Sequence, residues 1–523
     1  MELNDRVIWP TSDLPIGWSW ASFSDVLKNV TDSGKKVKQQ NYSTVGNFPV
    51  IDQGKDLVGG YSDDLALVYE GPLPCLVFGD HTKCVKYLDT MFIQGADGVK
   101  VLVPSGLWEP KFSYWALCAL VLPDKGYSRH FRFVREASFP VPPLNEQKRI
   151  VAKLEALRGH SSRARAALEA VEPLLERFRQ SVLAAAFRGD LTRKWREQHP
   201  DVEPAEVLLE RIRAERKARW VDEEAEKARA KAEEKARQAG QAWGASDNRQ
   251  VLERERAKAA ERYEEPEPID PTGLPALPDG WCWVALEEAI LSLDYGTSQK
   301  SSSDGEIPVL RMGNVQRGEI DWSDLVYTDD KDEIARYSLE PDTVLFNRTN
   351  SPELVGKTAI FRGERPAIFA GYLIRVKNLP SLRACYLNYN LNSSWARAWC
   401  WLNKTDGVSQ SNISAGKLAR YPLPFCSFEE QVVIEQEIQK RFSCLDRYAS
   451  LHTQTLANIR FLDQSILSKA FRGELVEQDP SDEPAEVLLG RIRAERRGKD
   501  SGGEKQGEGG EAGGQKRGRK KKG

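Results

Sequence analysis

The chain repeats itself once, and this duplication constrains its fold more than any other feature of the sequence. Four pairs of segments recur in the same order, and the fourth pair differs at one position in fourteen. Four collinear matches do not arise by chance, so a duplicated architecture is expected. The pairs are LPIGWSWASFSDV (14–26) with LPDGWCWVALEEAI (277–290), FPVPPLNEQKRIV (139–151) with YPLPFCSFEEQVV (421–433), SVLAAAFRGDL (181–191) with SILSKAFRGEL (465–475), and EPAEVLLERIRAER (203–216) with EPAEVLLGRIRAER (483–496).

The offset in residue number between the two copies distinguishes a repeated frame from the variable segments that it encloses. From Glu146 and Glu430 to the FRGDL and FRGEL segments, the offset between the copies stays at 284. At the opening tryptophans, Trp18 and Trp281, the offset is 263. The segments that lie between these landmarks differ in length and hardly resemble each other. This pattern indicates one scaffold that carries two different globular parts.

Each copy contains a long segment with apolar residues at alternating four- and three-residue steps, which is the spacing of a coiled-coil seam. Each segment follows a proline-containing run and ends near Arg-Gly, as helices commonly do. Pro173 predicts a kink in the first helix. The simplest assembly packs the two helices antiparallel, with a globular head at either end. The alternative is two unrelated amphipathic helices, each buried in its own domain. The predicted seam residues are Ile150, Leu154, Leu157, Leu168, Leu175, Phe178, Ile434, Ile438, Leu445, Ile459, Leu462 and Ile466.

The two globular parts read as mixed domains of strands and helix. Apolar runs such as FPVIDQG, PCLVFGDHTKCVKYLD, IPVLRMGNV and DTVLFNRTN are bounded by turn signals, and a helix is expected around 111–122 in the first part and 382–402 in the second. Polar clusters on the turns are the candidate DNA contacts, because these side chains hydrogen-bond to bases or hold phosphates. Taken alone, each of these residues is explained equally well as a turn-forming residue or as a charge exposed to solvent. The candidates are Gln53, Lys55, His81, Thr82, Lys83, Arg311, Asn314, Asn347, Arg348 and Lys357.

The composition narrows the classes of function. The net charge is only -2, so any DNA contact must come from local basic surface. The eight cysteines form no CxxC pair, which argues against a zinc site, and no signal peptide or membrane-length apolar run is evident, so a cytoplasmic protein is expected. SPELVGKT (351–358) lacks the first glycine of a phosphate-binding loop. With no adenine-methylation or helicase motif either, the chain is expected to be non-catalytic and to bind no metal or cofactor.

The LP-x-GW opening of each half, the EQ helix start and the FRGDL/FRGEL helix end resemble the specificity subunit of type I restriction-modification enzymes. This resemblance implies an α+β fold with an internal pseudo-two-fold repeat, in which two globular α/β target-recognition domains are separated by two long antiparallel coiled-coil helices. The 205–262 segment, read as a solvated charged helix or linker, departs from the shortest family members. The implied boundaries are target-recognition domain 1 at 1–143, the first coiled-coil helix at 144–191, a charged helical connector at 192–265, target-recognition domain 2 at 266–425, the second coiled-coil helix at 426–475, and a repeat-like helix with a disordered basic tail at 476–523.

The resemblance also implies a mechanism. Each recognition domain reads one half of a split site in double-stranded DNA, and the helices set the gap and dock two modification (methyltransferase) subunits that carry S-adenosylmethionine. Restriction (motor-nuclease) subunits join with ATP and Mg²⁺. A coiled-coil scaffold with protein-binding heads and no DNA role is the alternative. An enzyme that methylates DNA unaided is a third possibility, against which the missing motifs count.

Overall fold

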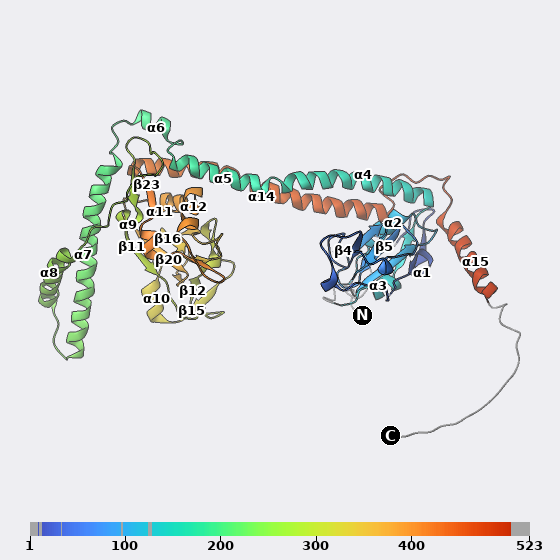
Figure 1. Ribbon diagram of the computed structural model, residues 1–523, viewed down its shortest axis with the longest axis horizontal. Helices are drawn as coiled ribbons and strands as arrows, with labels where there is room; N and C mark the ends of the chain where they lie inside the picture. The colour runs from blue at the N-terminus through green and yellow to red at the C-terminus, as the bar shows by residue number, and fades with distance from the viewer. Residues whose placement is uncertain (1–8, 10–12, 33, 96–97, 124–127, 504–523) are drawn as a thin grey trace, which may run out of the picture. The chain divides into compact units, whose positions relative to one another are not determined.

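A computed structural model describes residues 9, 13–32, 34–95, 98–123 and 128–503, so the predicted disordered tail falls almost entirely outside the described residues. The chain forms two compact units. Unit 1 comprises Met1–Glu169 and His452–Gly523, and unit 2 comprises Ala170–Leu451. Each unit mixes helices with sheets, in agreement with the α+β class (Figure 1). None of the helices in the described part of the chain combines the length and hydropathy needed to cross a bilayer.

Unit 1 is built around a four-stranded sheet of order β2-β8-β5-β6 and a three-stranded sheet of order β4-β3-β7, with β1 paired to β9. Its strands are β1 (Ser19–Ser22), β2 (Leu27–Asn29), β3 (Phe48–Ile51), β4 (Gly60–Ser62), β5 (Cys75–Gly79), β6 (Val85–Leu88), β7 (Ile93–Gln94), β8 (Val99–Pro104) and β9 (Ser138–Val141). Its helices are α1 (Phe23–Val26), α2 (Pro110–Ala119), α3 (Phe131–Glu136), α4 (Leu144–Glu169), α15 (Ala485–Gly503) and the second part of α14 (Phe428–Phe471).

Unit 2 contains a six-stranded sheet of order β11-β20-β16-β18-β14-β13, three-stranded sheets β15-β12-β19 and β17-β22-β21, and the pair β10-β23. Its strands are β10 (Cys282–Ala285), β11 (Ile290–Tyr295), β12 (Ile307–Leu310), β13 (Val315–Gln316), β14 (Gly318–Ile320), β15 (Val326–Thr328), β16 (Thr343–Asn347), β17 (Thr349–Asn350), β18 (Thr358–Phe361), β19 (Ile368–Phe369), β20 (Leu373–Asn378), β21 (Thr405–Asp406), β22 (Ser411–Asn412) and β23 (Pro422–Phe425). Its helices are α5 (Glu172–Phe187), α6 (Arg193–Gln198), α7 (Ala205–Gln238), α8 (Ala245–Arg262), α9 (Leu286–Ala289), α10 (Lys331–Tyr337), α11 (Ala384–Leu391), α12 (Ser394–Asn403), α13 (Ala415–Ala419) and the first part of α14.

The two sheets share one topology although their sequences hardly match. In unit 1 the order β2-β8-β5-β6 is antiparallel throughout, and in unit 2 the order β11-β20-β16-β18 is also antiparallel throughout. The central strand of each smaller sheet, β3 or β12, pairs antiparallel with one neighbour and parallel with the other. The contents that looked unrelated in sequence therefore share one fold, and among the described residues β13, β14, β17, β21 and β22 are found only in unit 2.

Long helices pair antiparallel within each unit. In unit 1, α4 lies beside the second part of α14, and in unit 2, α5 lies beside its first part (Figure 1). A break separates α4 from α5 just before Pro173, as the proline predicts. Six predicted seam residues are buried and four are half-buried. The buried six are Ile150, Leu154, Ile434, Ile438, Leu445 and Ile466, and the half-buried four are Leu157, Leu168, Leu175 and Ile459.

The seam prediction is wrong at Phe178 and Leu462, whose side chains are 53% and 51% exposed. In both cases the next residue turns toward the partner helix instead. Arg179 donates to Asp446 at 2.6 Å, and Asp463 accepts from Ser161 Oγ at 2.6 Å. The Ser161–Asp463 bond is buried and the Arg179–Asp446 bond is exposed. Both are charge-assisted and hold a polar side chain against the partner helix, so each apolar neighbour is rotated into solvent.

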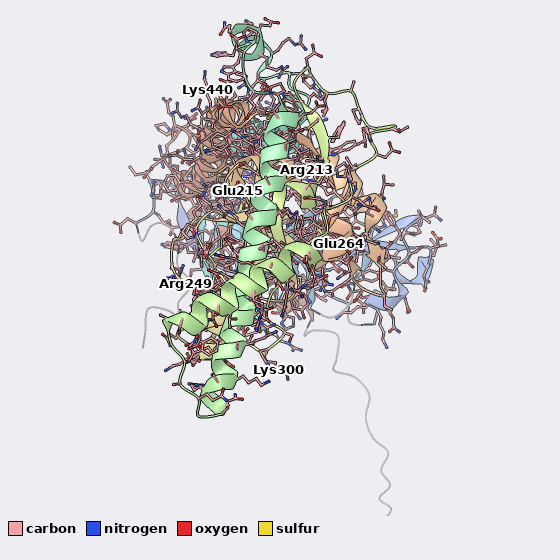
Figure 2. The ribbon with its side chains drawn as sticks, turned by 90° about the vertical axis from the view of Figure 1, so that its left-hand side faces the viewer. Arg213, Glu215, Arg249, Glu264, Lys300 and Lys440 are labelled. Carbon is pink, nitrogen blue, oxygen red and sulfur yellow. The ribbon has the colours of Figure 1, made fainter. Side chains whose placement is uncertain are left out.

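The charged connector is a helical hairpin and not one solvated helix. Helix α8 folds back against α7, and Ala225, Ala236 and Ala259 are buried (Figure 2). Gly240 turns the chain after α7 with a φ of +69°. The first turns of α7 enter the core of unit 2 through Leu208 and neighbouring apolar residues, because the EPAEVLL segment presents them at i, i+3 and i+4 spacing.

Candidate DNA-reading surfaces

The EQ motif joins each long helix to its globular part. In unit 1 the indole N–H of Trp18 donates to Glu146 Oε2 at 3.1 Å, and in unit 2 that of Trp281 donates to Glu430 Oε2 at 2.8 Å. All four side chains are buried. The tryptophan of LP-x-GW and the glutamate of EQ are therefore the two halves of one repeated contact, in which a buried polar atom on one segment requires its partner on the other.

The glutamine of the same motif closes a second repeated contact. In unit 1, Gln147 accepts from the backbone N–H of Glu109 at 2.8 Å and donates to two carbonyl oxygens, both at 3.0 Å. In unit 2, Gln431 accepts from the backbone N–H of Arg383 at 3.0 Å and donates to two carbonyls at 3.3 and 3.2 Å. The amide is fully used in each unit, and it fixes the start of the helix that follows the sheet (α2 or α11) against the long helix.

The FRG motif brings the end of each long helix back to the LP segment. Gly189 and Gly473 have φ values of +74° and +72°, which L side chains rarely adopt. A Cβ on either glycine would lie 2.4 Å from a proline Cγ, that of Pro278 or of Pro15. Each glycine is therefore required both by its backbone conformation and by the close approach of the proline.

The fourth repeated motif supplies an ion pair to each unit. Arg493 pairs with Asp25 at 2.7 Å, and Arg213 pairs with Glu288 at 2.6 Å. The hydrogen bond from Arg493 lowers the pKa of Asp25 to about 2. Both arginines come from the RIRAER segment, and both carboxylates are buried. The four repeated sequence motifs thus form the frame that carries the variable loops.

The first pair of candidate clusters occupies equivalent positions after β3 and β12. In unit 1, Gln53 contacts the β5–β6 turn through its side chain and backbone, and Lys55 is exposed. In unit 2, Arg311 pairs with Asp324 at 3.1 Å. Asn314 is only 2% exposed, and its amide is engaged by the backbone of Arg311, Asp321 and Asp324. In this structure the Asn314 side chain therefore holds the loop together, and its contact with DNA stays a prediction.

The second candidate cluster of unit 1 forms the tight turn between β5 and β6. The backbone N–H of His81 donates to Gln53 Oε1 at 3.3 Å, and Thr82 Oγ1 donates to the Gln53 carbonyl at 2.5 Å. Lys83 has a φ of +60° and donates to the carbonyl of Pro123 at 3.2 Å. The structure therefore brings Gln53, His81, Thr82 and Lys83 together on one rim.

In unit 2 the equivalent turn follows β16. Arg348 lies where unit 1 has Asp80, since the carbonyl of Arg348 accepts from Ile413 N at 2.9 Å and that of Asp80 accepts from His130 N at 2.8 Å. The Arg348 guanidinium donates to Gly371 O and Asn412 Oδ1 and lies 4.6 Å over the ring of Tyr295. This residue is pre-positioned by its neighbours and only partly exposed.

Two further candidates of this cluster differ in how far solvent reaches them. Asn347 is 0% exposed, and neither amide atom has a hydrogen-bond partner among the residues that the structure describes. Asn347 is therefore closed off from solvent in this structure, and its contact with a base stays a prediction. Lys357 is half-buried, donates to Gln316 Oε1 at 3.3 Å, and has its pKa lowered by burial.

Two aromatic residues on the rim of unit 2 were missed by the sequence reasoning. Tyr295 and Tyr372 are both exposed, and the carbonyl of Tyr372 accepts from the backbone N–H of Arg348 at 3.0 Å. A further signal was present in the strands themselves. FPVIDQGK and IPVLRMGN carry proline and glycine at the same spacing, and alignment of these two segments would have placed the loops in equivalent positions.

The chain is similar to specificity subunits over nearly its whole length. It is 25% identical to the type I restriction enzyme EcoKI specificity subunit of Escherichia coli (strain K12), and 24% identical to the StySPI specificity subunit of Salmonella potsdam. Both alignments cover 94% of this chain and 98% of the relative. No protein-family model matches the chain.

The fold agrees with a solved structure described as showing the complex assembly and conformational transition of a type I R-M system. That chain is covered completely, together with 89% of this chain, at a TM-score of 0.56 and 17% identity. The resemblance predicted from the repeated motifs is confirmed by the relatives at high coverage: the chain is a homologue of the type I restriction enzyme specificity subunits.

Proposed function

We propose that this chain is the non-catalytic DNA sequence-specificity subunit of a type I restriction-modification complex, with one reading domain in each unit. The observation that carries the proposal is the occurrence of one sheet topology twice on a repeated frame, with different side chains at equivalent loops. The loop after β3 presents Lys55 where that after β12 buries Asn314, and the turn after β5 has Asp80 where unit 2 has Arg348. Two different half-sites require such a difference, since base identity is read by side chains on the rim.

The paired helices have a second role in this proposal. They set the gap between the half-sites and dock two methyltransferase subunits. Exposed apolar side chains on paired helices mark surfaces for protein partners. In unit 2, Leu174, Phe178, Tyr448 and Leu451 are each at least half exposed, and in unit 1 the same is true of Phe461 and Leu462. The apolar residues that the seam prediction misplaced thus become candidates for the subunit interface.

The chemistry belongs to the partners in this proposal. The methyltransferase subunits carry S-adenosylmethionine and act on an adenine extruded from each half-site. Restriction subunits use ATP and Mg²⁺ on unmodified double-stranded DNA, and the complex works in the cytoplasm. This chain contributes recognition and assembly, which agrees with the small net charge, because partners help to enclose the DNA.

Single-molecule sequencing of adenine methylation in host DNA, with and without this gene, tests the proposal. The expected result is loss of methylation at one split, asymmetric motif, which also reveals both half-sites and the gap. If methylation is unchanged in a host whose methyltransferase subunits are expressed, the proposal fails. A scaffold without a DNA role then remains.

A further inference from the structure

Unit 2 carries an addition at the rim where the candidate reading loops meet. Helices α2 and α11 begin at equivalent positions, beside the buried Gln147 and Gln431, and α3 and α13 both lead into the strand before the long helix. Residues 120–130 connect α2 to α3 in unit 1, whereas the longer segment 392–414 connects α11 to α13 in unit 2. The extra length forms α12 and the two-stranded ribbon β21–β22.

The ribbon is attached firmly to the loop that contains Arg348. Strand β22 pairs with β17, and Ile413 N donates to the carbonyl of Arg348 at 2.9 Å. At its base, α12 packs through Ala396 and Cys400, which are buried. The contact with the sheet is close, because a Cβ on Gly356 would lie 2.5 Å from the sulfur of Cys400. The ribbon is therefore a defined projection of the rim.

The outward side chains of this addition are apolar. Val408, at the tip between β21 and β22, is fully exposed, and Leu402 and Trp401 at the base are 82% and 55% exposed. None of these three residues belongs to a hydrophobic core cluster of the described chain. Folding of unit 2 gains little from them, so a cluster of exposed large apolar side chains points to a partner.

Two lysines, one of them paired with a carboxylate of the ribbon, lie beside the ribbon. Lys404 Nζ lies 4.4 Å over the Trp401 ring and pairs with Asp406. Lys417 Nζ donates to the carbonyl of Asn403 at 2.7 Å and to Thr405 Oγ1 at 2.8 Å, both of which are neutral. The charge of Lys417 is therefore not cancelled by these contacts. An apolar tip beside a lysine whose hydrogen-bond contacts are neutral suits a polyanion that presents apolar groups in a groove.

We propose that residues 404–412 enter the major groove of the half-site read by unit 2, where Val408 contacts the 5-methyl group of a thymine. The major groove admits a two-stranded ribbon, and the thymine methyl is the apolar group that distinguishes base pairs there. The inference rests on the proposed function and adds to it a specificity-determining element in the longer segment that connects α11 to α13.

Replacement of thymine by uracil in the half-site, which removes only the 5-methyl group, tests the contact directly. The assembled methyltransferase complex containing the full chain is titrated with its duplex, and with duplexes carrying uracil at each thymine of one half-site in turn. For the wild type, one uracil in the half-site of unit 2 should weaken binding about fourfold, as expected for one methyl group removed from a buried contact. The complex with Val408→Ser should bind the thymine duplex more weakly and should not distinguish the two bases there.

The matched control is Val207→Ser, an exposed valine on α7 of the same unit, which should bind both duplexes like the wild type. Val408→Ser should keep the discrimination at the half-site of unit 1. If Val408→Ser binds like the wild type, or binds more weakly but still prefers thymine at the same position, the ribbon does not read a methyl group. A wild-type complex that binds no sequence specifically would instead contradict the proposed function itself.

Discussion

In units 1 and 2 the same Trp–Glu hydrogen bond holds the start of the long helix, but the second carboxylate oxygen of the glutamate is satisfied differently. Glu430 also accepts from Thr192 Oγ1 and Arg196 Nη1, both at 2.6 Å. Glu146 Oε1 has no hydrogen-bond partner among the described residues, and burial raises the pKa of this carboxyl to about 7. The cause lies in chain length, because the described segment 476–484 that follows FRGEL forms no helix equivalent to α6.

This difference shows which parts of a duplicated frame are constrained. The tryptophan, the glutamate and the glutamine keep the same geometry in both units because each fills a buried position that the backbone defines. The remaining partners of the glutamate come from a surface segment, where a change in length is tolerated. The reading rims differ still more, since unit 2 has added a ribbon to the shared topology.

The largest effect on stability is expected at the glutamine contacts, which are the same in both units. Gln147→Ala and Gln431→Ala each leave a buried N–H and two buried carbonyls without their side-chain partner, and each should destabilise its own unit by about 3–5 kcal/mol. Hydrogen exchange with mass spectrometry, which reports each unit separately, measures the loss. Similar losses of protection against hydrogen exchange are expected in α2 for Gln147→Ala and in α11 for Gln431→Ala. A large loss in one unit only would contradict the equivalence of the two joints.

The glutamates should respond differently to the same substitution. Glu430→Gln leaves Arg196, whose side chain is only 20% exposed, without its ion pair. Removal of one partner of a largely buried pair costs about 2–4 kcal/mol, so unit 2 should unfold at a lower denaturant concentration. Arg196→Ala with Glu430→Gln should recover part of the loss, because no unpaired guanidinium remains. A double variant no more stable than Glu430→Gln would exclude the ion pair as the cause.

Glu146→Gln should stabilise unit 1 at alkaline pH. The folded pKa of about 7 lies above the ordinary glutamate value of 4.5, so the stability associated with the proton is present below about 4.5 and is lost as the pH rises through 7. Glutamine remains neutral and still accepts from Trp18. The variant should therefore gain about 1–2 kcal/mol over the wild type at pH 8 and little at pH 4.5. Unfolding curves at both pH values check this, and equal differences would contradict it.

The sequence predicted the frame better than the rims because frame residues are set by local pattern. Repeated motifs, helix periodicity and the break at Pro173 depend on neighbours in the chain. The structure shows the break at Pro173, and ten of the twelve predicted seam residues are buried or half-buried. Phe178 and Leu462 could not be placed from periodicity, because hydrogen bonds to Asp446 and from Ser161 rotate the helices by one residue. Those partners come from another helix and leave no local signal.

The candidate DNA contacts also depended on packing that the local sequence does not reveal. Residue type selected Asn314 and Asn347 because asparagine can pair with adenine, but burial depends on how the loop folds over them. The loops that carry the candidate residues could be predicted, since the clusters of both units fall on equivalent loops. The contacts that each side chain makes on its loop could not. The ribbon lies in the segment 392–414, whose equivalent 120–130 is much shorter, so comparison of the repeats could not point to it.

The smallest effect on stability, and the sharpest test of the reading rims, comes from the equivalent residues Lys55 and Asn314. Lys55 is exposed, so Lys55→Ala should leave the unfolding of unit 1 unchanged within about 0.5 kcal/mol. If this lysine holds a phosphate, DNA affinity should fall at all sequences, and the slope of log affinity against log salt concentration should decrease by about 1. Asn314→Ala should instead destabilise the loop after β12 and leave the salt slope unchanged, because its amide bonds only to backbone within that loop. Titrations of the assembled complex at several salt concentrations distinguish the two outcomes. An unchanged slope for Lys55→Ala would remove this lysine from the interface, and a reduced slope for Asn314→Ala would mean that the loop as a whole, more than any single side chain, contacts the DNA backbone.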